Sequence, residues 1–144
     1  VYETVNNGVY RCGFAKSQEA YEESFHKLFA SIDWLEERLS RQRYIAGNVL
    51  TEADVRLYTT LIRFDSVYYS HFKCNLRRIE DYPNLSNYLR DLYQTRGFGD
   101  TTDLPAIKRN YYGGMLHINP TGIVPVGPAI DYRRPHDRAR LTAG

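Results

Sequence analysis

Apolar residues recur every three or four positions along much of the chain, which is the pattern of helices that bury one face. The longest such stretch begins after Ser17, a favourable N-cap residue, and is expected to end near Arg41 to Arg43. A later stretch opens at Pro83, which suits the first turn of a helix, and Gly97 is expected to stop it. The apolar positions of the two stretches are Tyr21, Phe25, Leu28, Phe29, Ile32, Leu35 and Leu39, and then Leu85, Tyr88, Leu89, Leu92 and Tyr93.

The stretch between them, from Thr51 to Tyr68, predicts the central, buried helix of a bundle. Thr51 is a favourable N-cap, and Asp54 can accept a hydrogen bond from the Thr51 backbone N–H, as in a capping box. Leu50 and Val55 flank this cap as a hydrophobic staple would. The apolar positions on nearly every face of this helix are Val55, Tyr58, Leu61, Ile62 and Tyr68. Unpaired buried charges are costly, so three residues are expected at its ends or in pairs: Arg56, Arg63 and Asp65.

Glycine and proline divide the rest of the chain. Asn6-Asn7-Gly8 predicts a turn, and the preceding residues 1–5 read as the end of an earlier helix. Residues 69–81 are expected to be a polar, basic connection. Asp103-Leu104-Pro105 predicts the start of a shorter helix that runs to about Tyr112, where Gly113 and Gly114 end it.

Beyond Gly114, four prolines exclude a long helix, so residues 116–144 are expected to run extended over the surface, with at most a short strand near residues 123–126. The sequence thus predicts an all-α fold, with a helical domain over residues 1–115 and a Pro-rich arm over residues 116–144.

Composition indicates one ordinary globular domain. The chain has 144 residues, of which 42% are hydrophobic and 25% charged, so it can build a core of its own. It has no signal peptide and no apolar run that could span a bilayer, so a soluble, cytoplasmic protein is expected. The start at Val1, without an initiator Met, indicates a fragment or a processed chain.

The net charge is only +2, but the arm is locally basic. Asp131 and Asp137 dilute its arginines, so a solvated or partner-docked terminus is a better interpretation than a nucleic-acid contact. The arginines concerned are Arg133, Arg134, Arg138 and Arg140.

No metal or phosphate motif is present in the sequence. The four histidines lack ligand spacing, and no glycine-rich phosphate loop occurs. Cys12 and Cys74 form no Cys-x-x-Cys motif; two isolated thiols are favoured, with a disulfide between them left open. Lys73 and His71 are placed to lower the pKa of Cys74, although a partly buried structural thiol is the favoured interpretation. The thirteen tyrosines are expected at wet edges of the core or in a pocket.

Several motifs, in order along almost the whole chain, resemble one known family. Gly47-Asn48-x-Leu50-Thr51-x-Ala53-Asp54 resembles the cap-and-staple signature of the helical C-terminal domain of cytosolic glutathione transferases. Four further motifs narrow the resemblance to the glutathionyl-hydroquinone reductases, the xi class of that superfamily. They are Val5-Asn6-Asn7-Gly8-Val9-Tyr10, Arg63-Phe64-Asp65-Ser66-Val67-Tyr68, His71-Phe72-Lys73-Cys74 and Ile118-Asn119-Pro120-Thr121-Gly122-Ile123.

The resemblance implies a helical bundle that closes a hydroquinone pocket with tyrosines. Tyr10 stands where the family has a proton donor and acceptor for the quinol, and Tyr68 and Tyr111 stand where it has tyrosines that line the pocket and stabilise a cysteine thiolate. That nucleophilic cysteine belongs to an N-terminal thioredoxin-like domain, which is expected to be absent from this chain. Neither Cys12 nor Cys74 has the family's Cys-Pro context, so this chain alone is expected to be inactive.

The implied reaction removes the thiol from S-glutathionyl-hydroquinones. The thiolate attacks the sulfur of the conjugate and releases hydroquinone, and a second thiol resolves the mixed disulfide. The co-substrate is glutathione or another low-molecular-weight thiol such as mycothiol, without a metal. The expected partners are small aromatic hydroquinone–thiol conjugates, the thioredoxin-like domain and a second copy in a homodimer, but neither nucleic acid nor membrane.

An alternative from another class is a stand-alone domain of this kind that serves protein interaction or dimerisation without catalysis. Tyrosines that fail to line a cleft would favour it. A nucleic-acid-binding domain is less favoured, because the chain lacks interleaved aromatic and basic residues.

Overall fold

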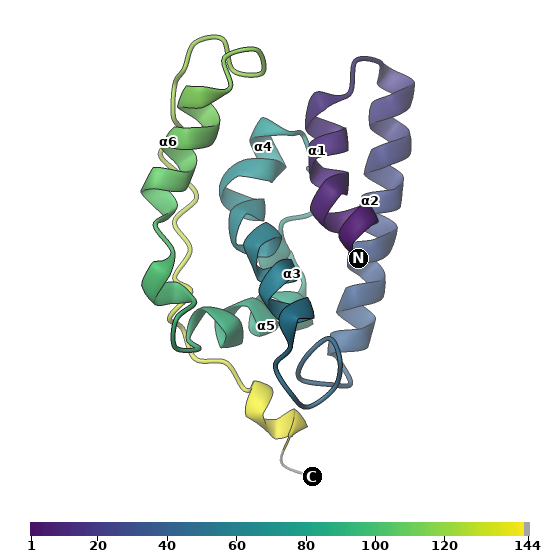
Figure 1. Cartoon of the computed structure of the whole chain (residues 1–144), viewed down its shortest axis with the longest axis vertical. Coiled ribbons are helices and arrows are strands. Elements are labelled where there is room, and N and C mark those ends of the chain that lie inside the picture. The colour runs from purple at the N-terminus through teal and green to yellow at the C-terminus, as the bar shows by residue number, and fades with distance from the viewer. Residues whose placement is uncertain (143–144) are drawn as a thin grey trace.

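The structure is a computed structural model that describes residues 1–142. Those residues form helices and loops without a β-strand, so the all-α prediction is confirmed. In Figure 1, α1 and α2 lie side by side, the central helix runs beside them, and α6 packs on the far side of it. The α-helices are α1 (Asn7–Phe14), α2 (Gln18–Leu39), α3 (Glu52–Arg63), α4 (Tyr69–His71), α5 (Pro83–Tyr93) and α6 (Leu104–Gly114). Two π-helical turns (Tyr2–Asn6 and Phe64–Tyr68) and three 3₁₀ turns (Ile79–Asp81, Gly99–Thr101 and Arg138–Leu141) connect them.

Helix α2 begins where its sequence predicts. The Ser17 hydroxyl oxygen accepts a hydrogen bond from the Ala20 backbone N–H at 3.1 Å, which confirms it as the N-cap. The helix ends at Leu39, slightly before the expected end, because the Ser40 hydroxyl donates to the Glu37 carbonyl and turns the chain. The apolar stripe is confirmed, with buried members Leu28, Phe29, Ile32, Leu35 and Leu39.

The central helix consists of α3, the π-helical turn Phe64–Tyr68 and α4 in direct succession. Its predicted cap is confirmed, because the Asp54 carboxylate accepts from the Thr51 backbone N–H at 2.9 Å. Asp54 is also fully buried and accepts from the Tyr88 hydroxyl at 2.7 Å. The prediction that Val55 belongs to the core is wrong, because its side chain is 45% exposed beside a surface pocket.

Two loop predictions are wrong because tertiary contacts favour helix. Asn6-Asn7-Gly8, predicted as a turn, is helical: the Asn6 side-chain amide donates to the Arg56 carbonyl at 2.9 Å and to the Thr60 hydroxyl at 2.7 Å. These bonds hold the segment against α3 and override its turn propensity. The connection expected over residues 69–81 starts only after His71, because α4 continues the central helix.

Pro83 and Asp103 start α5 and α6 as predicted, and the Asp103 carboxylate accepts from the Ala106 N–H at 3.0 Å. Helix α6 includes Gly113 and Gly114, which were expected only to end it. Its chain then returns beside the bundle as the arm, seen behind α6 in Figure 1. No helix among residues 1–142 is long and apolar enough to cross a membrane.

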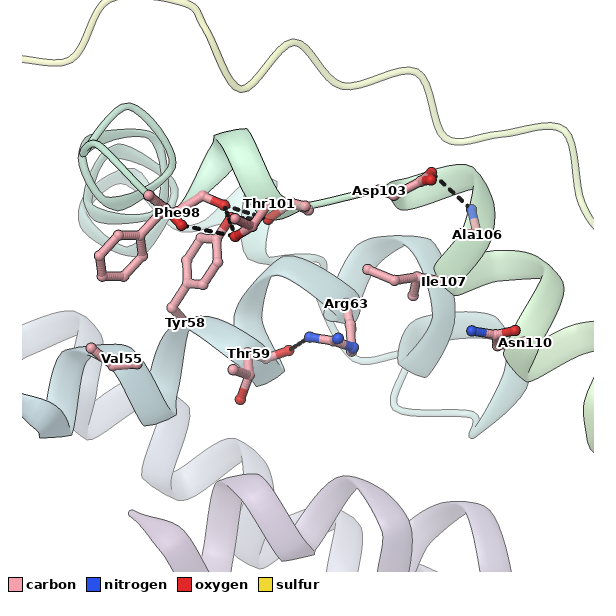
Figure 2. Close-up of a pocket in the computed structure, with 12 residues that line it drawn as sticks. Val55, Tyr58, Thr59, Arg63, Phe98, Thr101, Asp103, Ala106, Ile107 and Asn110 are labelled. Atoms are coloured by element: carbon pink, nitrogen blue, oxygen red, sulfur yellow. Dashed lines mark hydrogen bonds between the residues drawn. The ribbon is translucent and has the colours of Figure 1, made fainter.

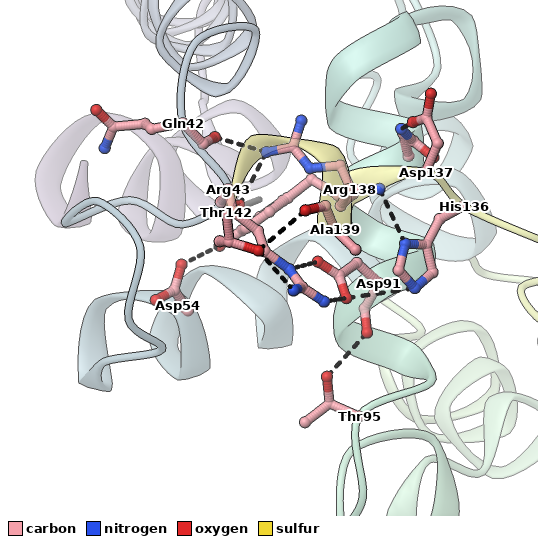
Figure 3. Close-up of polar contacts among 12 residues, drawn as sticks. Gln42, Arg43, Asp54, Asp91, Thr95, His136, Asp137, Arg138, Ala139 and Thr142 are labelled. Atoms are coloured by element: carbon pink, nitrogen blue, oxygen red, sulfur yellow. Dashed lines mark hydrogen bonds and ion pairs between the residues drawn. The ribbon is translucent and has the colours of Figure 1, made fainter. Parts of the chain in front are cut away.

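The arm is extended over residues 122–131 as expected, but it turns at residues 116–118, 120–121 and 132–134. Its expected solvated or partner-docked character is wrong at Arg138. The side chain of Arg138 is fully buried under the chain's own bundle (Figure 3). Its guanidinium donates to the backbone carbonyls of Leu39 at 2.5 Å, Gln42 at 2.7 Å and Arg43 at 2.8 Å. The last two residues of the predicted arm, 143–144, lie outside the described residues.

Candidate functional site

Three tyrosine hydroxyls from separate segments meet at one edge of the bundle. Tyr10 comes from α1, Tyr68 ends the π-helical turn of the central helix, and Tyr111 comes from α6. The Tyr10 and Tyr111 oxygens are 2.5 Å apart, Tyr68 and Tyr111 are 3.0 Å apart, and Tyr10 and Tyr68 are 3.4 Å apart. We call these three residues the tyrosine cluster. The structure therefore brings together all three tyrosines singled out from the sequence.

Phe72 supports the tyrosine cluster from below. Its ring is stacked on Tyr68, with centroids 5.3 Å apart, and packs against Tyr10 at 5.2 Å and Tyr111 at 6.0 Å. Gly13 makes this approach possible, because a Cβ there would lie 2.3 Å from Phe72 Cδ1. The sequence analysis did not single out Phe72, although this residue lies in one of the recognised motifs. Gly13, one helical turn after Tyr10, was the sequence feature that could have indicated a bulky side chain packed against this part of α1.

Two members of the cluster hold their protons more tightly than an exposed tyrosine does. Burial raises the pKa of Tyr68, which is buried, and also that of the half-buried Tyr111. Each tyrosine hydroxyl carries one proton that it can donate. If each hydroxyl donates once, the three contacts of the cluster occupy all three protons. Since the 3.4 Å contact between Tyr10 and Tyr68 is the longest, it is the one that an incoming acceptor would replace most easily.

A pocket of about 390 Å³ lies between α3, α6 and the loop before α6 (Figure 2), and none of the three cluster tyrosines lines it. Its apolar side includes Tyr58 and Phe98, whose rings meet edge to face at 5.0 Å, and the exposed Val55. Arg63 and Asn110 line the end nearest Tyr111. Among the described residues, the hydrogen-bond acceptor of the Arg63 guanidinium is the Thr59 carbonyl at 2.8 Å, which leaves its other donors available.

The other candidate groups are not arranged as reactive sites of a known kind. Residues 1–142 contain no group of three or more potential metal ligands. Cys12 and Cys74 are free and buried, so no disulfide joins them in this structure. The suggestion of an activated Cys74 is wrong, because a hydrogen bond to Cys12 and burial raise the pKa of its thiol. Two free thiols, rather than a disulfide, were the favoured expectation for this pair, and the structure agrees with it.

Comparison with known proteins agrees with the fold and with the resemblance seen in the sequence. The chain is 58% identical over 129 residues to glutathionyl-hydroquinone reductase PcpF of Sphingobium chlorophenolicum, covering 90% of this chain and 41% of the relative. It is 53% identical over 138 residues to glutathionyl-hydroquinone reductase YqjG of Escherichia coli, covering 96% of this chain and 42% of the relative. The chain thus spans about two fifths of the length of these relatives.

Solved structures and a family model lead to the same assignment. The xi-class glutathione transferase of Natrialba magadii superposes with a TM-score of 0.95 at 47% identity, covering 96% of this chain and 42% of that one. The model of the family described as glutathione S-transferase, C-terminal domain, matches residues 18–91 of the 144, about half of the chain. This chain therefore belongs to the glutathione S-transferase C-terminal domain family.

Proposed function

We propose that this chain is the substrate-pocket part of a thiol-dependent reductase that converts S-glutathionyl-hydroquinones to hydroquinones. The observation that carries the proposal is the tyrosine cluster, in which three hydroxyls from distant segments converge at one edge of the bundle. Its support is the set of relatives that carry the name glutathionyl-hydroquinone reductase. The small thiol is glutathione or a related low-molecular-weight thiol, and the conjugate is a small aromatic one.

The three tyrosines have different tasks in this proposal. Tyr10 is half-buried and donates or accepts the proton of the quinol oxygen. Tyr68 and Tyr111 keep their protons at neutral pH and can donate hydrogen bonds to a thiolate, which stabilises the charged form of the sulfur. Breaking the long Tyr10–Tyr68 contact frees one hydroxyl proton for the substrate while the Tyr10–Tyr111 bond persists.

A thioredoxin-like domain supplies the attacking cysteine in this proposal. Its thiol must reach the tyrosine cluster, because reacting groups have to approach within about 3–3.5 Å. The pocket between α3 and α6 exposes Val55 near the start of α3 and the available donors of Arg63 at its end. We assign the docking of that domain to this pocket, whose apolar side suits a buried side chain and whose Arg63 end suits a carboxylate.

A reduction assay on the full-length gene product, alongside its intact mass, tests the proposal. With S-glutathionyl-menadiol as substrate, Tyr10→Phe is expected to lower kcat/KM by about 10²-fold or more, because it removes the proton donor. Tyr2→Phe is the matched control, since Tyr2 is exposed and outside the cluster, and it should leave activity unchanged. A native product of only these 144 residues, inert and dimeric, would instead support an interaction module.

We also propose a homodimer to which the arm contributes. Val126 is fully exposed on the arm near the largely exposed Ile123, whereas Arg138 holds the arm's far end on the bundle. Truncating the arm would also remove Arg138 and its hydrogen bonds to the bundle, which would change stability as well as the dimer interface. A point substitution on the arm is therefore the cleaner test. Val126→Glu is expected to shift the mass in light scattering towards the monomer. An unchanged dimer would show that Val126 is not part of the interface.

A further inference from the structure

A row of aromatic rings leads from the tyrosine cluster to the surface of the bundle. Phe14 is the last residue of α1, one turn after Tyr10, so the two side chains lie on the same face of that helix. Its ring centroid is 5.8 Å from that of Tyr10 and 5.5 Å from that of Phe72. The ring of His117, in the segment after α6, lies 5.7 Å from that of Phe14. The row therefore joins α1, the end of the central helix and the segment after α6.

The outer end of this row is open to solvent, whereas its inner end is buried. Phe72 is fully buried, Tyr10 is half-buried and Phe14 is 46% exposed. His117 is exposed as well. An aromatic side chain that keeps nearly half of its surface in water forgoes part of the free energy that burial would give. Phe14 and His117 thus form an open aromatic edge beside Tyr10, and we call this pair the ring platform.

The turn that carries His117 is held by hydrogen bonds on both of its sides. The Met115 carbonyl accepts from the backbone N–H groups of Ile118 at 3.0 Å and Asn119 at 2.9 Å. The Asn119 side-chain amide donates to the Tyr112 carbonyl at 2.8 Å, which ties the turn to the last turn of α6. In Figure 1 the end of α1 and this segment lie at the same end of the bundle. The fold itself therefore fixes the backbone on both sides of the ring platform.

The spacing of the rings determines how a further aromatic ring can bind. Aromatic pairs prefer offset or edge-to-face contacts with centroids about 4.5–7 Å apart, and each spacing in this row falls in that range. No ring can enter between Phe14 and His117, because it would need a contact of that length on each side. An incoming ring must therefore lie over the platform. A single ring placed next to Tyr10 covers Phe14 alone, whereas two fused rings reach His117 as well.

We propose that the ring platform binds the aromatic part of the hydroquinone–thiol conjugate and favours fused two-ring systems over single rings. The inference rests on the proposed function for the identity of that conjugate. Phe14 and His117 are positioning and specificity-determining residues in it: they hold the ring so that its quinol oxygen meets Tyr10, and they transfer no proton. The aromatic ring thus binds outside the three hydroxyls, and its oxygen reaches the cluster from the solvent side.

Binding of menadione, the oxidised two-ring parent of menadiol, tests the ring platform without catalysis. In titration calorimetry on the full-length gene product, Phe14→Ala should weaken binding about tenfold, and Phe14→Tyr, which keeps the ring, should bind as the wild type does. Tyr10→Phe should also still bind. Trp34→Ala is the matched control, because Trp34 is an aromatic residue of α2 that is 51% exposed and outside the row.

Two results of this titration would overturn the proposal: no binding by the wild type, or equal binding by the wild type and Phe14→Ala. His117→Ala, at an exposed position of a turn, keeps the test decisive if Phe14→Ala does not fold. This variant should also bind menadione more weakly than the wild type, and unchanged binding would remove His117 from the site.

Kinetics with two conjugates separates this inference from the proposed function. For S-glutathionyl-menadiol, Phe14→Ala should raise KM about tenfold with little change in kcat, because Tyr10 remains in place. His117→Ala should raise KM for this two-ring substrate but not for the one-ring S-glutathionyl-benzene-1,4-diol. An active enzyme with unchanged KM in both variants would overturn the ring platform and leave the proposed function standing. An inert full-length product that binds menadione through Phe14 would overturn the proposed function and support the platform.

Discussion

Two regions of the molecule gather polar side chains in opposite ways. The first is a clasp formed by Arg43, Asp91, His136 and Arg138, which fastens the arm to α5 and to the loop after α2 (Figure 3). In it, Asp91 accepts from Arg43 Nε and Nη2 at 2.9 Å each, and His136 Nε2 lies 3.4 Å from Asp91. Arg138 directs its two terminal nitrogens to three backbone carbonyls.

The second region is the tyrosine cluster, which is neutral where the clasp is charged. Within residues 1–142 its hydroxyls are satisfied only by one another, and two of its three members are partly open to solvent. A buried charge must keep its partners, because losing one leaves the other uncompensated in a medium that solvates it poorly. Neutral phenols can exchange one partner for another at far lower cost. The clasp is therefore built to stay closed, and the cluster is built to accept a ligand.

Removing Arg138 should give the largest loss of stability. Arg138→Met is expected to lower the free energy of unfolding by about 3–5 kcal/mol, because three buried or partly buried carbonyls lose their donor and the arm loses its anchor. Urea denaturation measures this loss. Arg140→Met is the matched control, since Arg140 is an exposed arginine of the same short turn, and it should change stability by at most about 0.5 kcal/mol. Equal losses in both variants would show that Arg138 does not fasten the arm.

Asp65 is an intermediate case: a buried carboxylate with two N–H donors and, in the part of the chain that the structure describes, no ion-pair partner. It accepts from the backbone N–H groups of Ile79 at 2.6 Å and Glu80 at 3.0 Å, yet burial raises its pKa from 3.8 to about 6. The folded state thus binds this proton more tightly than the unfolded state. Its contribution to stability is greatest below pH 3.8 and falls as pH rises to about 6, by about 3 kcal/mol in all.

The predicted direction, a loss of stability as pH rises, is checked by measuring the free energies of unfolding of the wild type and of Asp65→Asn across this pH range. Asparagine cannot ionise, so the variant should lack this fall, and its stability relative to the wild type should improve as pH rises. A difference that does not change with pH would mean that Asp65 titrates alike in the folded and unfolded states.

Local chemistry explains which elements could be predicted from the sequence. Ser17, Thr51 with Asp54, and Asp103 each act within three residues of their own position, so their helix starts were readable. The failures lie where distant contacts decide. Asn6 bonds to residues 50 and 54 positions away, and Arg138 bonds to a carbonyl 99 positions away. The residues next to Asn6 and Arg138 in the sequence give no indication of these distant hydrogen-bond partners.

The candidate site was predictable only in part, for the same reason. Thirteen tyrosines cannot be ranked by composition, and the hydroxyls that meet come from residues 43 to 101 positions apart. The resemblance to a known family selected Tyr10, Tyr68 and Tyr111. It did not reveal the pocket between α3 and α6, because that pocket depends on how α6 and the loop before it lie against α3.

The smallest of these effects on stability, and the sharpest test of the contrast between clasp and cluster, comes from two buried tyrosines. Tyr68→Phe should lower the free energy of unfolding by about 1 kcal/mol or less, because Tyr10 and Tyr111 remain bonded to each other at 2.5 Å. Tyr88→Phe should cost more, about 1.5–3 kcal/mol, because the Tyr88 hydroxyl donates to the buried Asp54 carboxylate at 2.7 Å. Urea denaturation of both variants gives the comparison. If Tyr68→Phe lowered the free energy of unfolding as much as Tyr88→Phe, the cluster would stabilise the fold as the clasp does. A site that exchanges one hydrogen-bond partner for a ligand must instead tolerate the loss of that partner.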